Sequence, residues 1–176
     1  MGSRPIQALL NGLKRQGVTV TASENGSFPI SIKTNGLVGG ILDLADGDQS
    51  SQYLSAMLMA APLATQPIEI RTDLSVSRPY IDMTIDLMGK FGVNVERTDY
   101  NVFRVDAPQS YEGCNYTIEA DASTASYFFA VAAMTGGRVA VNHITRSESI
   151  QGDLKFLQIL EDMGCTIEQK GGAVEV

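Results

Sequence analysis

The chain has 176 residues, which is enough for one large domain or two small ones. Hydrophobic residues make up 44% of the sequence, so a substantial core can form and the composition argues against wholesale disorder. The formal net charge of −7 argues against a nucleic-acid-binding protein, because such proteins need a basic face. It leaves open an anionic small molecule as substrate, since a few local arginines can outweigh a distant acidic surface.

The predicted elements alternate along the chain between amphipathic helices and short strands rich in β-branched residues. A helix within "RPIQALLNGLKRQGVTV" comes first and is expected to end at Gly17. A second helix begins near Ser51, and a third carries an apolar stripe at Ile81, Ile85 and Met88. The strands expected in this stretch are Ile41–Leu44, Ile68–Ile70, Val93–Val95 and Val102–Val105.

The same order of elements returns in the last third of the sequence. A helix within "DASTASYFFAVAAM" precedes one with an apolar stripe at Leu154, Leu157 and Leu160. Gly92 and Gly164 follow matching stripes, where a helix end favours a left-handed residue. The strands expected here are Tyr116–Ile118, Val139–Val141, Thr166–Glu168 and Val174–Val176.

An internal repeat underlies this order. The segment "DQSSQYLSAMLMAA" aligns with "DASTASYFFAVAAM" at an offset of 73 residues, and Gly92 aligns with Gly164 at an offset of 72. The opening helix matches the second half of the same unit. The sequence therefore predicts an α/β (α+β) protein with about two and a half βαβαββ units. Repeat arrays normally close with atypical caps, and neither end resembles one, so we expect a segment of a longer chain.

The first cluster of polar residues that could bind a ligand is Ser50, Ser51 and Gln52, just before an apolar helix. Serine is a preferred N-cap residue, so these side chains could simply cap the helix. A helix N-terminus also presents free N–H groups and a positive dipole end, and added hydroxyls would make a phosphate site. Both interpretations stay open from the residues alone. Asp121, Ser123 and Thr124 occupy the matching place in the next unit, where capping is favoured more strongly because Ala125 stands in place of the glutamine.

The second cluster lies in "SVSRPYID", residues 75–82. Pro79 suits the first turn of a helix, with Ser77 as the N-cap. Arg78 and Tyr80 then flank the helix start. The segment is either a capped helix with a solvated arginine or a second corner that binds an anion or a hydroxyl. Arg4 repeats the Arg-Pro pattern one unit earlier.

Other chemical signals are weak. The sequence has neither a nucleotide-binding glycine motif nor a Ser/His/Asp set. Two cysteines, Cys114 and Cys165, and one histidine, His143, are too few for a metal site, and we expect both thiols to be buried and reduced. The longest apolar run, Tyr53–Leu63, is shorter than the ~18 residues of a membrane span. These features predict a soluble, cytoplasmic protein without a metal, a membrane or a nucleic acid as partner.

Four motifs in register over Arg4–Val176 resemble the 3-phosphoshikimate 1-carboxyvinyltransferase (EPSP synthase) family. They are "SSQYLSAMLMAAPLA", "SRPYIDMTIDLMGKFGV", "EADASTASYFFAVAAMTGG" and "SIQGDLKFLQILEDMGC". The resemblance implies an inverse α/β barrel fold of six βαβαββ units, three in each of two domains that close on the substrates. It implies transfer of the enolpyruvyl group of phosphoenolpyruvate to shikimate 3-phosphate, in the shikimate pathway to chorismate and aromatic amino acids, with no cofactor.

The resemblance also implies residue roles. Ser50, Ser51 and Ser77 would bind the 3-phosphate of shikimate 3-phosphate. Tyr80 would line the shikimate pocket, and Gln52 would contact the shikimate ring close to phosphoenolpyruvate.

Arg4 would be a ligand of phosphoenolpyruvate. The catalytic residues of the family have no match in this sequence, so we expect no catalytic residue in this segment and no turnover by the chain alone.

The domain crossover of the family would fall near Ile118, giving 4–118 as one and a half repeat units of one domain and 119–176 as about one unit of the other. Such a piece exposes strand edges, and self-association or a complementing chain would cover them.

Two alternatives remain open at this point. The chain could be a non-catalytic stand-alone binding module that kept the fold and lost the reaction. It could also belong to a relative acting on a different enolpyruvyl acceptor, although an acceptor without that phosphate would leave the three serines without a ligand.

Overall fold

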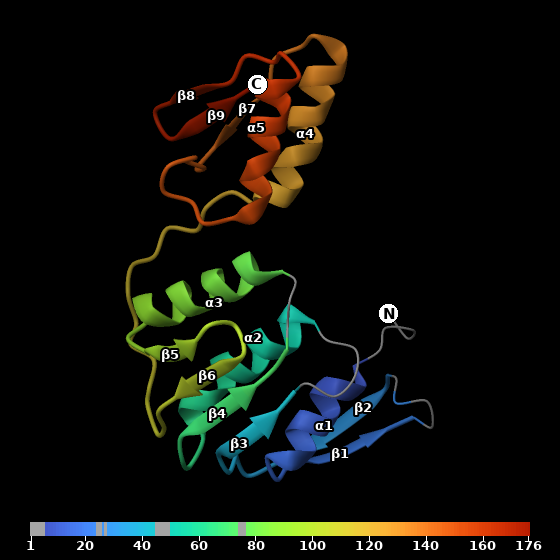
Figure 1. Ribbon diagram of the computed structural model, residues 1–176, viewed down its shortest axis with the longest axis vertical. Coiled ribbons are helices and arrows are strands. Elements are labelled where there is room, and N and C mark those ends of the chain that lie inside the picture. The colour runs from blue at the N-terminus through green and yellow to red at the C-terminus, as the bar shows by residue number, and fades with distance from the viewer. Residues whose placement is uncertain (1–5, 24–25, 27, 45–49, 74–76) are drawn as a thin grey trace. The chain divides into compact units, whose positions relative to one another are not determined.

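The structure is a computed structural model that describes residues 6–23, 26, 28–44, 50–73 and 77–176. It divides into two compact bodies (Figure 1). The N-terminal body ends at Cys114 and the C-terminal body begins at Asn115.

The N-terminal body begins with helix α1 (Gln7–Arg15) and a hairpin of two antiparallel strands, β1 (Thr19–Ala22) and β2 (Ile30–Lys33). Leu9 and Leu13 of α1 are partly buried and pack against the core of this body. The order helix, strand, strand matches the half unit that the sequence predicts.

A complete repeat unit follows in the order β3 (Gly40–Asp43), α2 (Ser51–Ala60), β4 (Ile68–Arg71), α3 (Arg78–Lys90), β5 (Val95–Thr98) and β6 (Val102–Val105). A short 3-10 turn, Ala61–Leu63, extends α2. The four strands form one sheet in the order β3-β4-β6-β5, in which β3 and β4 are parallel and the other pairs are antiparallel.

The parallel pair decides where the two helices begin. Helix α2 follows β3 and helix α3 follows β4 along the chain. A connection between parallel strands must return the chain to the starting edge, so each helix runs antiparallel to the strand before it. Both helices therefore begin at the end of the sheet where β3 and β4 finish.

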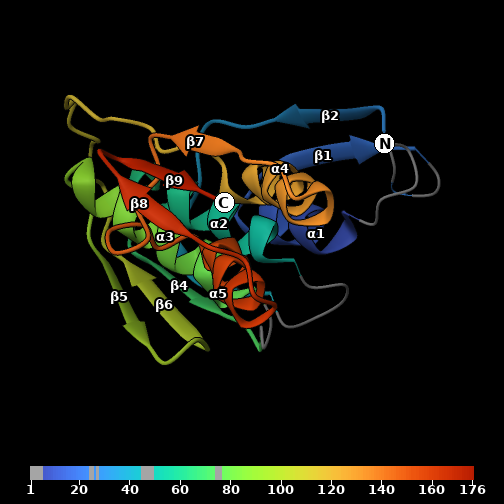
Figure 2. The ribbon, with the colours of Figure 1, turned by 90° about the horizontal axis from the view of Figure 1, so that it is seen from above.

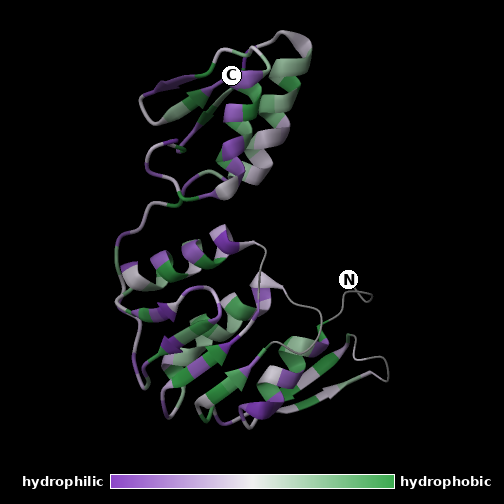
Figure 3. Cartoon of the chain, in the orientation of Figure 1, coloured by the Kyte–Doolittle hydropathy of each residue, from purple (hydrophilic) through white to green (hydrophobic). Residues whose placement is uncertain are grey.

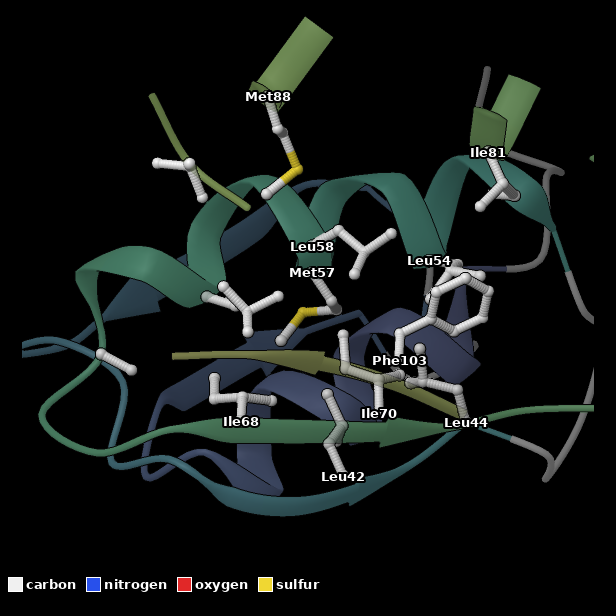
Figure 4. Close-up of a cluster of buried hydrophobic side chains, with 14 residues drawn as sticks. Leu42, Leu44, Leu54, Met57, Leu58, Ile68, Ile70, Ile81, Met88 and Phe103 are labelled. Carbon is white, nitrogen blue, oxygen red and sulfur yellow. The ribbon is translucent and has the colours of Figure 1, made fainter. Parts of the chain in front are cut away.

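The core of the N-terminal body lies between this sheet and the two helices (Figure 4). Leu42 and Ile70 of the sheet and Leu58 of α2 are fully buried. Ile81 and Met88 point toward α2 from α3, at the two ends of the cluster. Both residues belong to the apolar stripe expected for α3, so the stripe predicted from the helical period faces the core.

The C-terminal body repeats the order with helix α4 (Ala122–Thr135), β7 (Ala140–Asn142), the 3-10 turn Gly152–Leu154, α5 (Lys155–Asp162), β8 (Glu168–Lys170) and β9 (Ala173–Glu175). Its antiparallel sheet has the order β7-β9-β8, seen from another side in Figure 2. Phe129 of α4, Leu157 of α5 and Val174 of β9 form the centre of a separate core.

Helix α4, like α2, carries no charged residue (Figure 3). One face buries Ala125, Phe129 and Ala132 in the core. Another side exposes Tyr127 and Met134, which are 75% and 85% exposed.

The ends of three helices are built in the same way, which confirms the repeat at atomic detail. Gly17, Gly92 and Gly164 all have positive φ angles, between 79° and 95°. The residue after each glycine donates its backbone N–H to a carbonyl five residues earlier, which is the Schellman arrangement. The three bonds are Val18 to Leu13 (3.1 Å), Val93 to Met88 (2.9 Å) and Cys165 to Leu160 (2.9 Å).

Among the sequence-based expectations that the structure corrects, one concerns a strand and another the cysteines. Residues 116–118 form no strand, and Ile118 is 80% exposed. The matching strand β3 pairs with β4, whereas here Ala120 donates its N–H to the carbonyl of His143, the residue after β7, at 2.7 Å. The segment has β-branched residues but no ladder, so its composition alone does not make it a strand.

The cysteines are the second correction. Both are free thiols, as expected, but Cys114 is exposed and Cys165 is half-buried rather than both being buried. Cys165 is the residue after Gly164 and packs at the edge of the C-terminal core. Cys114 lies where the two bodies divide, in a segment without a core of its own.

Candidate anion-binding site

The N-terminus of α2 carries the first cluster. Ser50 is the N-cap: its backbone is extended and its side chain accepts a hydrogen bond from the Gln52 N–H at 3.3 Å. Ser51 is the first helical residue and is 9% exposed, whereas Gln52 is exposed. The first turn of α2 contains no acidic residue. The positive end of this helix dipole is therefore not neutralised within its own first turn.

The N-terminus of α3 carries the second cluster. Pro79 occupies the first turn, as predicted. Ser77 is in the N-cap position, but its side chain makes no capping hydrogen bond, so the predicted capping role is wrong. Its backbone is left-handed, with φ 61°, which is uncommon for a residue with a Cβ and is often found at functional sites. Its exposed hydroxyl is not used by the helix that it precedes.

A hydroxyl pair joins the two helices close to these ends. Ser55 Oγ and Thr84 Oγ1 are 2.7 Å apart. The Thr84 hydroxyl donates to the Tyr80 carbonyl at 2.8 Å, so its single hydrogen is used and Ser55 is the donor of the pair. This link joins the second turns of α2 and α3. The side chain of Tyr80, one turn before Thr84, is 46% exposed.

The N-terminus of the matching helix in the C-terminal body, α4, is capped by the Asp121 carboxylate. Asp121 Oδ1 accepts hydrogen bonds from the N–H groups of Ser123 (2.9 Å) and Thr124 (3.3 Å), and Oδ2 accepts one from the Thr124 hydroxyl at 2.8 Å. These bonds, the Thr124 hydroxyl first, lower the pKa of the Asp121 carboxyl below its ordinary value. The predicted capping role of Asp121 is confirmed. A second anion at this helix end would meet a carboxylate.

Three residues near the start of α3 were not identified from the sequence. Tyr100 lies between two guanidinium groups, with Arg78 Cζ 4.6 Å and Arg97 Cζ 4.5 Å from its ring centroid. Its hydroxyl donates to the Asp82 carboxylate, which also forms an ion pair with Arg97. The hydrogen bond that Arg97 donates to Asp82, together with the attraction of the Asp82 charge, raises the pKa of Arg97. Tyr100 follows β5 and Asp82 lies in α3, so only the fold brings them together.

Arg4, the expected ligand of phosphoenolpyruvate, lies outside the residues that the structure describes. No group of three or more His, Cys, Asp or Glu side chains in the described ranges could hold a metal ion. Within the same ranges, no helix is both long and apolar enough to cross a membrane.

The structural comparison defines the class of protein. The fold is similar to that of EPSP synthase from Acinetobacter baumannii, with a TM-score of 0.71 at 24% sequence identity over 99% of this chain and 40% of that one. A second structure of EPSP synthase from the same organism has a TM-score of 0.70. The chain therefore has the mixed α/β fold of part of these proteins, an inverse α/β barrel type built from βαβαββ units.

The sequence comparison gives the family. The profile of the EPSP synthase (3-phosphoshikimate 1-carboxyvinyltransferase) family matches residues 1–176. The chain belongs to this family. It is 49% identical, over 96% of its length, to a 3-phosphoshikimate 1-carboxyvinyltransferase of Photobacterium profundum, and 46% identical over its full length to one of a Nostoc species. It spans about two fifths of the length of these relatives (40% and 41%).

Proposed function

We propose that this chain carries the shikimate 3-phosphate half of an enolpyruvyl transferase site, with phosphoenolpyruvate as the second substrate. Membership of the family supports the reaction class. The observation that carries the proposal is the pair of helix N-termini at one end of the sheet, with Ser50 and Ser51 on one and Ser77 on the other.

The physical chemistry of this end of the sheet favours a phosphate ester. Helix N-termini offer unpaired N–H groups and a partial positive charge to an anion. Neither first turn contains an acidic residue, in contrast to α4, which Asp121 caps. The Ser50 hydroxyl already accepts one N–H and can donate its own hydrogen to a phosphate oxygen.

The remaining expected contacts are with the uncharged part of the substrate. Gln52 is exposed in the first turn of α2, and the side chain of Tyr80 is half exposed in the first turn of α3. A carboxamide and a phenol can each donate to and accept from ring hydroxyls. We propose these roles for shikimate, with Gln52 and Arg4 also facing phosphoenolpyruvate.

We further propose that the chain does not turn over alone. Enolpyruvyl transfer between two anionic substrates requires proton transfer and stabilisation of developing charge. The resemblance matches none of the family's catalytic residues to this sequence. The 40% coverage of the relatives agrees with a partial site.

Titration of the 15N-labelled chain with shikimate 3-phosphate, and separately with shikimate, tests the proposal. We expect amide shifts at Ser50–Gln52 and Ser77–Tyr80 with the phosphate ester only. The amides of Asp121–Thr124, at the matching but carboxylate-capped helix end, are the internal control and should not shift. A folded chain that shows no shifts at the two serine clusters would contradict the half-site and favour a non-catalytic module.

A further inference from the structure

We infer that Tyr100 is a positioning residue that holds the Arg78 guanidinium beside Ser77 as the cationic group of the anion site. This inference rests on the proposed function, because it gives that site a charge it otherwise lacks. The sequence left Arg78 open as a solvated arginine or an anion clamp. The Tyr100 contacts favour the second interpretation.

The geometry around Tyr100 is an interlocked cluster rather than a single contact. The Arg78 and Arg97 guanidinium carbons lie 4.6 and 4.5 Å from the Tyr100 ring centroid, within cation–π range. The Tyr100 hydroxyl oxygen is 2.8 Å from Asp82 Oδ2 and 3.0 Å from Oδ1. Asp82 also binds Arg97. The ring is therefore fixed from its hydroxyl end and is half-buried against the core.

The charges in this cluster do not cancel. Asp82 is neutralised by Arg97, with which it forms the ion pair. Arg78 makes no ion pair with an acidic side chain among the residues that the structure describes. One positive charge is thus left in the first turn of α3.

That charge lies at an unfavourable place for the helix itself. A cation at a helix N-terminus opposes the dipole, so an unconstrained arginine there would turn toward solvent. Stacking on the Tyr100 ring limits that freedom and holds the guanidinium at the start of α3, the helix that Ser77 precedes. The cation and the positive end of the helix dipole then both attract an approaching anion. Both therefore favour a doubly charged phosphate ester over the uncharged hydroxyls of the shikimate ring.

Two substitutions separate the ring of Tyr100 from its hydroxyl. Tyr100→Phe keeps the stacking surface and removes the hydrogen bond to Asp82. Tyr100→Leu removes the ring while keeping an apolar side chain against the core. Tyr111→Leu is the matched control: Tyr111 is another half-exposed tyrosine, and its hydroxyl donates to the Met59 carbonyl at 2.8 Å.

The first measurement needs no ligand. An arginine side chain held over an aromatic ring has ring-current-shifted proton resonances. We expect shifted Arg78 side-chain signals in the unaltered chain and in Tyr100→Phe, and loss of the shift in Tyr100→Leu. Amide exchange at Ser77 and Arg78 should accelerate in Tyr100→Leu only. Tyr111→Leu should leave the Arg78 signals unchanged.

The second measurement is the Kd for shikimate 3-phosphate. We expect Tyr100→Leu to weaken binding about five- to tenfold, the range of an exposed to partly desolvated cation–π contact, and Tyr100→Phe to stay within about twofold. Arg78→Gln should weaken binding as much as Tyr100→Leu. Combining the two should add little, because both remove the same positioned charge. Arg78 is exposed, so Arg78→Gln provides the test if Tyr100→Leu does not fold.

The outcomes distinguish this inference from the proposed function. Unshifted Arg78 signals in the unaltered chain, or shifted signals retained in Tyr100→Leu, would overturn the positioning role. Equal loss of affinity in Tyr100→Phe and Tyr100→Leu would also overturn it, because the ring would then not matter. If the unaltered chain fails to bind shikimate 3-phosphate while the Arg78 shift depends on the ring, the half-site is wrong and the stacking is structural only.

Discussion

One pair of substitutions can separate the capping role of Ser50 from its proposed role in binding the ligand. Its side chain accepts the Gln52 N–H, and we propose that it also binds a phosphate oxygen. Ser50→Ala should lower the free energy of unfolding by about 1 kcal/mol, while Ser50→Gly should lower it by only a few tenths of a kcal/mol, because glycine is tolerated at an N-cap. Both should lose the same affinity for shikimate 3-phosphate, since both lack the hydroxyl. Urea unfolding and titration measure the two quantities.

A loss of affinity that follows stability, large for Ser50→Ala and small for Ser50→Gly, would mean that Ser50 only caps the helix. Ser149→Ala is the matched control for removal of a serine hydroxyl. The Ser149 hydroxyl accepts the Gln151 N–H at 3.2 Å in the C-terminal body, whereas both serine clusters belong to the N-terminal body. It should leave affinity unchanged.

Asp121 predicts a pH dependence of the C-terminal body. Hydrogen bonds from Thr124 and Ser123 lower its pKa below the ordinary value of 3.8. A carboxyl with a lowered folded-state pKa stabilises the fold fully above its unfolded pKa, and this contribution is lost as the pH falls through the folded pKa. The stability advantage of the unaltered chain over Asp121→Asn should therefore be constant near neutral pH and shrink below pH 3.8.

Urea unfolding of both chains from about pH 7 to about pH 2.5 measures this difference. Other carboxyl groups titrate in both chains, so their effects cancel in the comparison. An advantage that does not depend on pH would show that the Asp121 charge is unimportant for the α4 cap.

At the level of elements, the Ser55–Thr84 hydroxyl pair links α2 to α3. Thr84→Val keeps the side-chain shape and removes the hydroxyl, so the partly buried Ser55 loses its acceptor. A double-mutant cycle with Ser55→Ala should give a coupling energy of about 0.5–1.5 kcal/mol in urea unfolding. The same substitutions should weaken binding of shikimate 3-phosphate, because the two N-termini are then less firmly held together. A coupling energy near zero would show that the pair does not fix the helices.

Element boundaries follow from the sequence where a local signal sets them. Gly17, Gly92 and Gly164 end their helices because the left-handed conformation is easy for glycine. The strand expected at Val93–Val95 forms instead at Val95–Thr98, because Val93 is used by the helix-ending motif and is buried in the core. Residues 116–118 fail as a strand because pairing depends on a neighbour, which no local pattern encodes.

At the level of the whole molecule, the two cores share no residue. Leu58 in α2 and Leu157 in α5 are each fully buried in one of them. Leu58→Ala should lower the stability of the N-terminal body by about 2–5 kcal/mol, from lost burial and the cavity left behind, and Leu157→Ala should do the same for the C-terminal body. Amide hydrogen exchange, followed peptide by peptide, should accelerate only in the body that carries the substitution. Acceleration in both bodies would mean that they unfold as one cooperative unit.

The division into bodies bears on the predicted domain boundary. The sequence places it near Ile118, and the structure separates compact bodies between Cys114 and Asn115. That these bodies are the two domains of the longer relatives stays a prediction. The exposed apolar side of α4, with Tyr127 and Met134, is what we expect of a body that covers only part of a domain.

The sequence by itself determined the repeat, the order of the elements, the helix ends and the two serine clusters, because these depend on local patterns and spacing. How the clusters are arranged in space depends on contacts between residues far apart in the sequence, so it follows from the tertiary structure alone. The parallel pairing of β3 with β4 brings Ser50 and Ser77 to one end of the sheet. Packing of the β5–β6 turn against α3 brings Tyr100 to Arg78. The left-handed backbone of Ser77 has no signal in its residue type, because a residue with a Cβ rarely adopts this conformation.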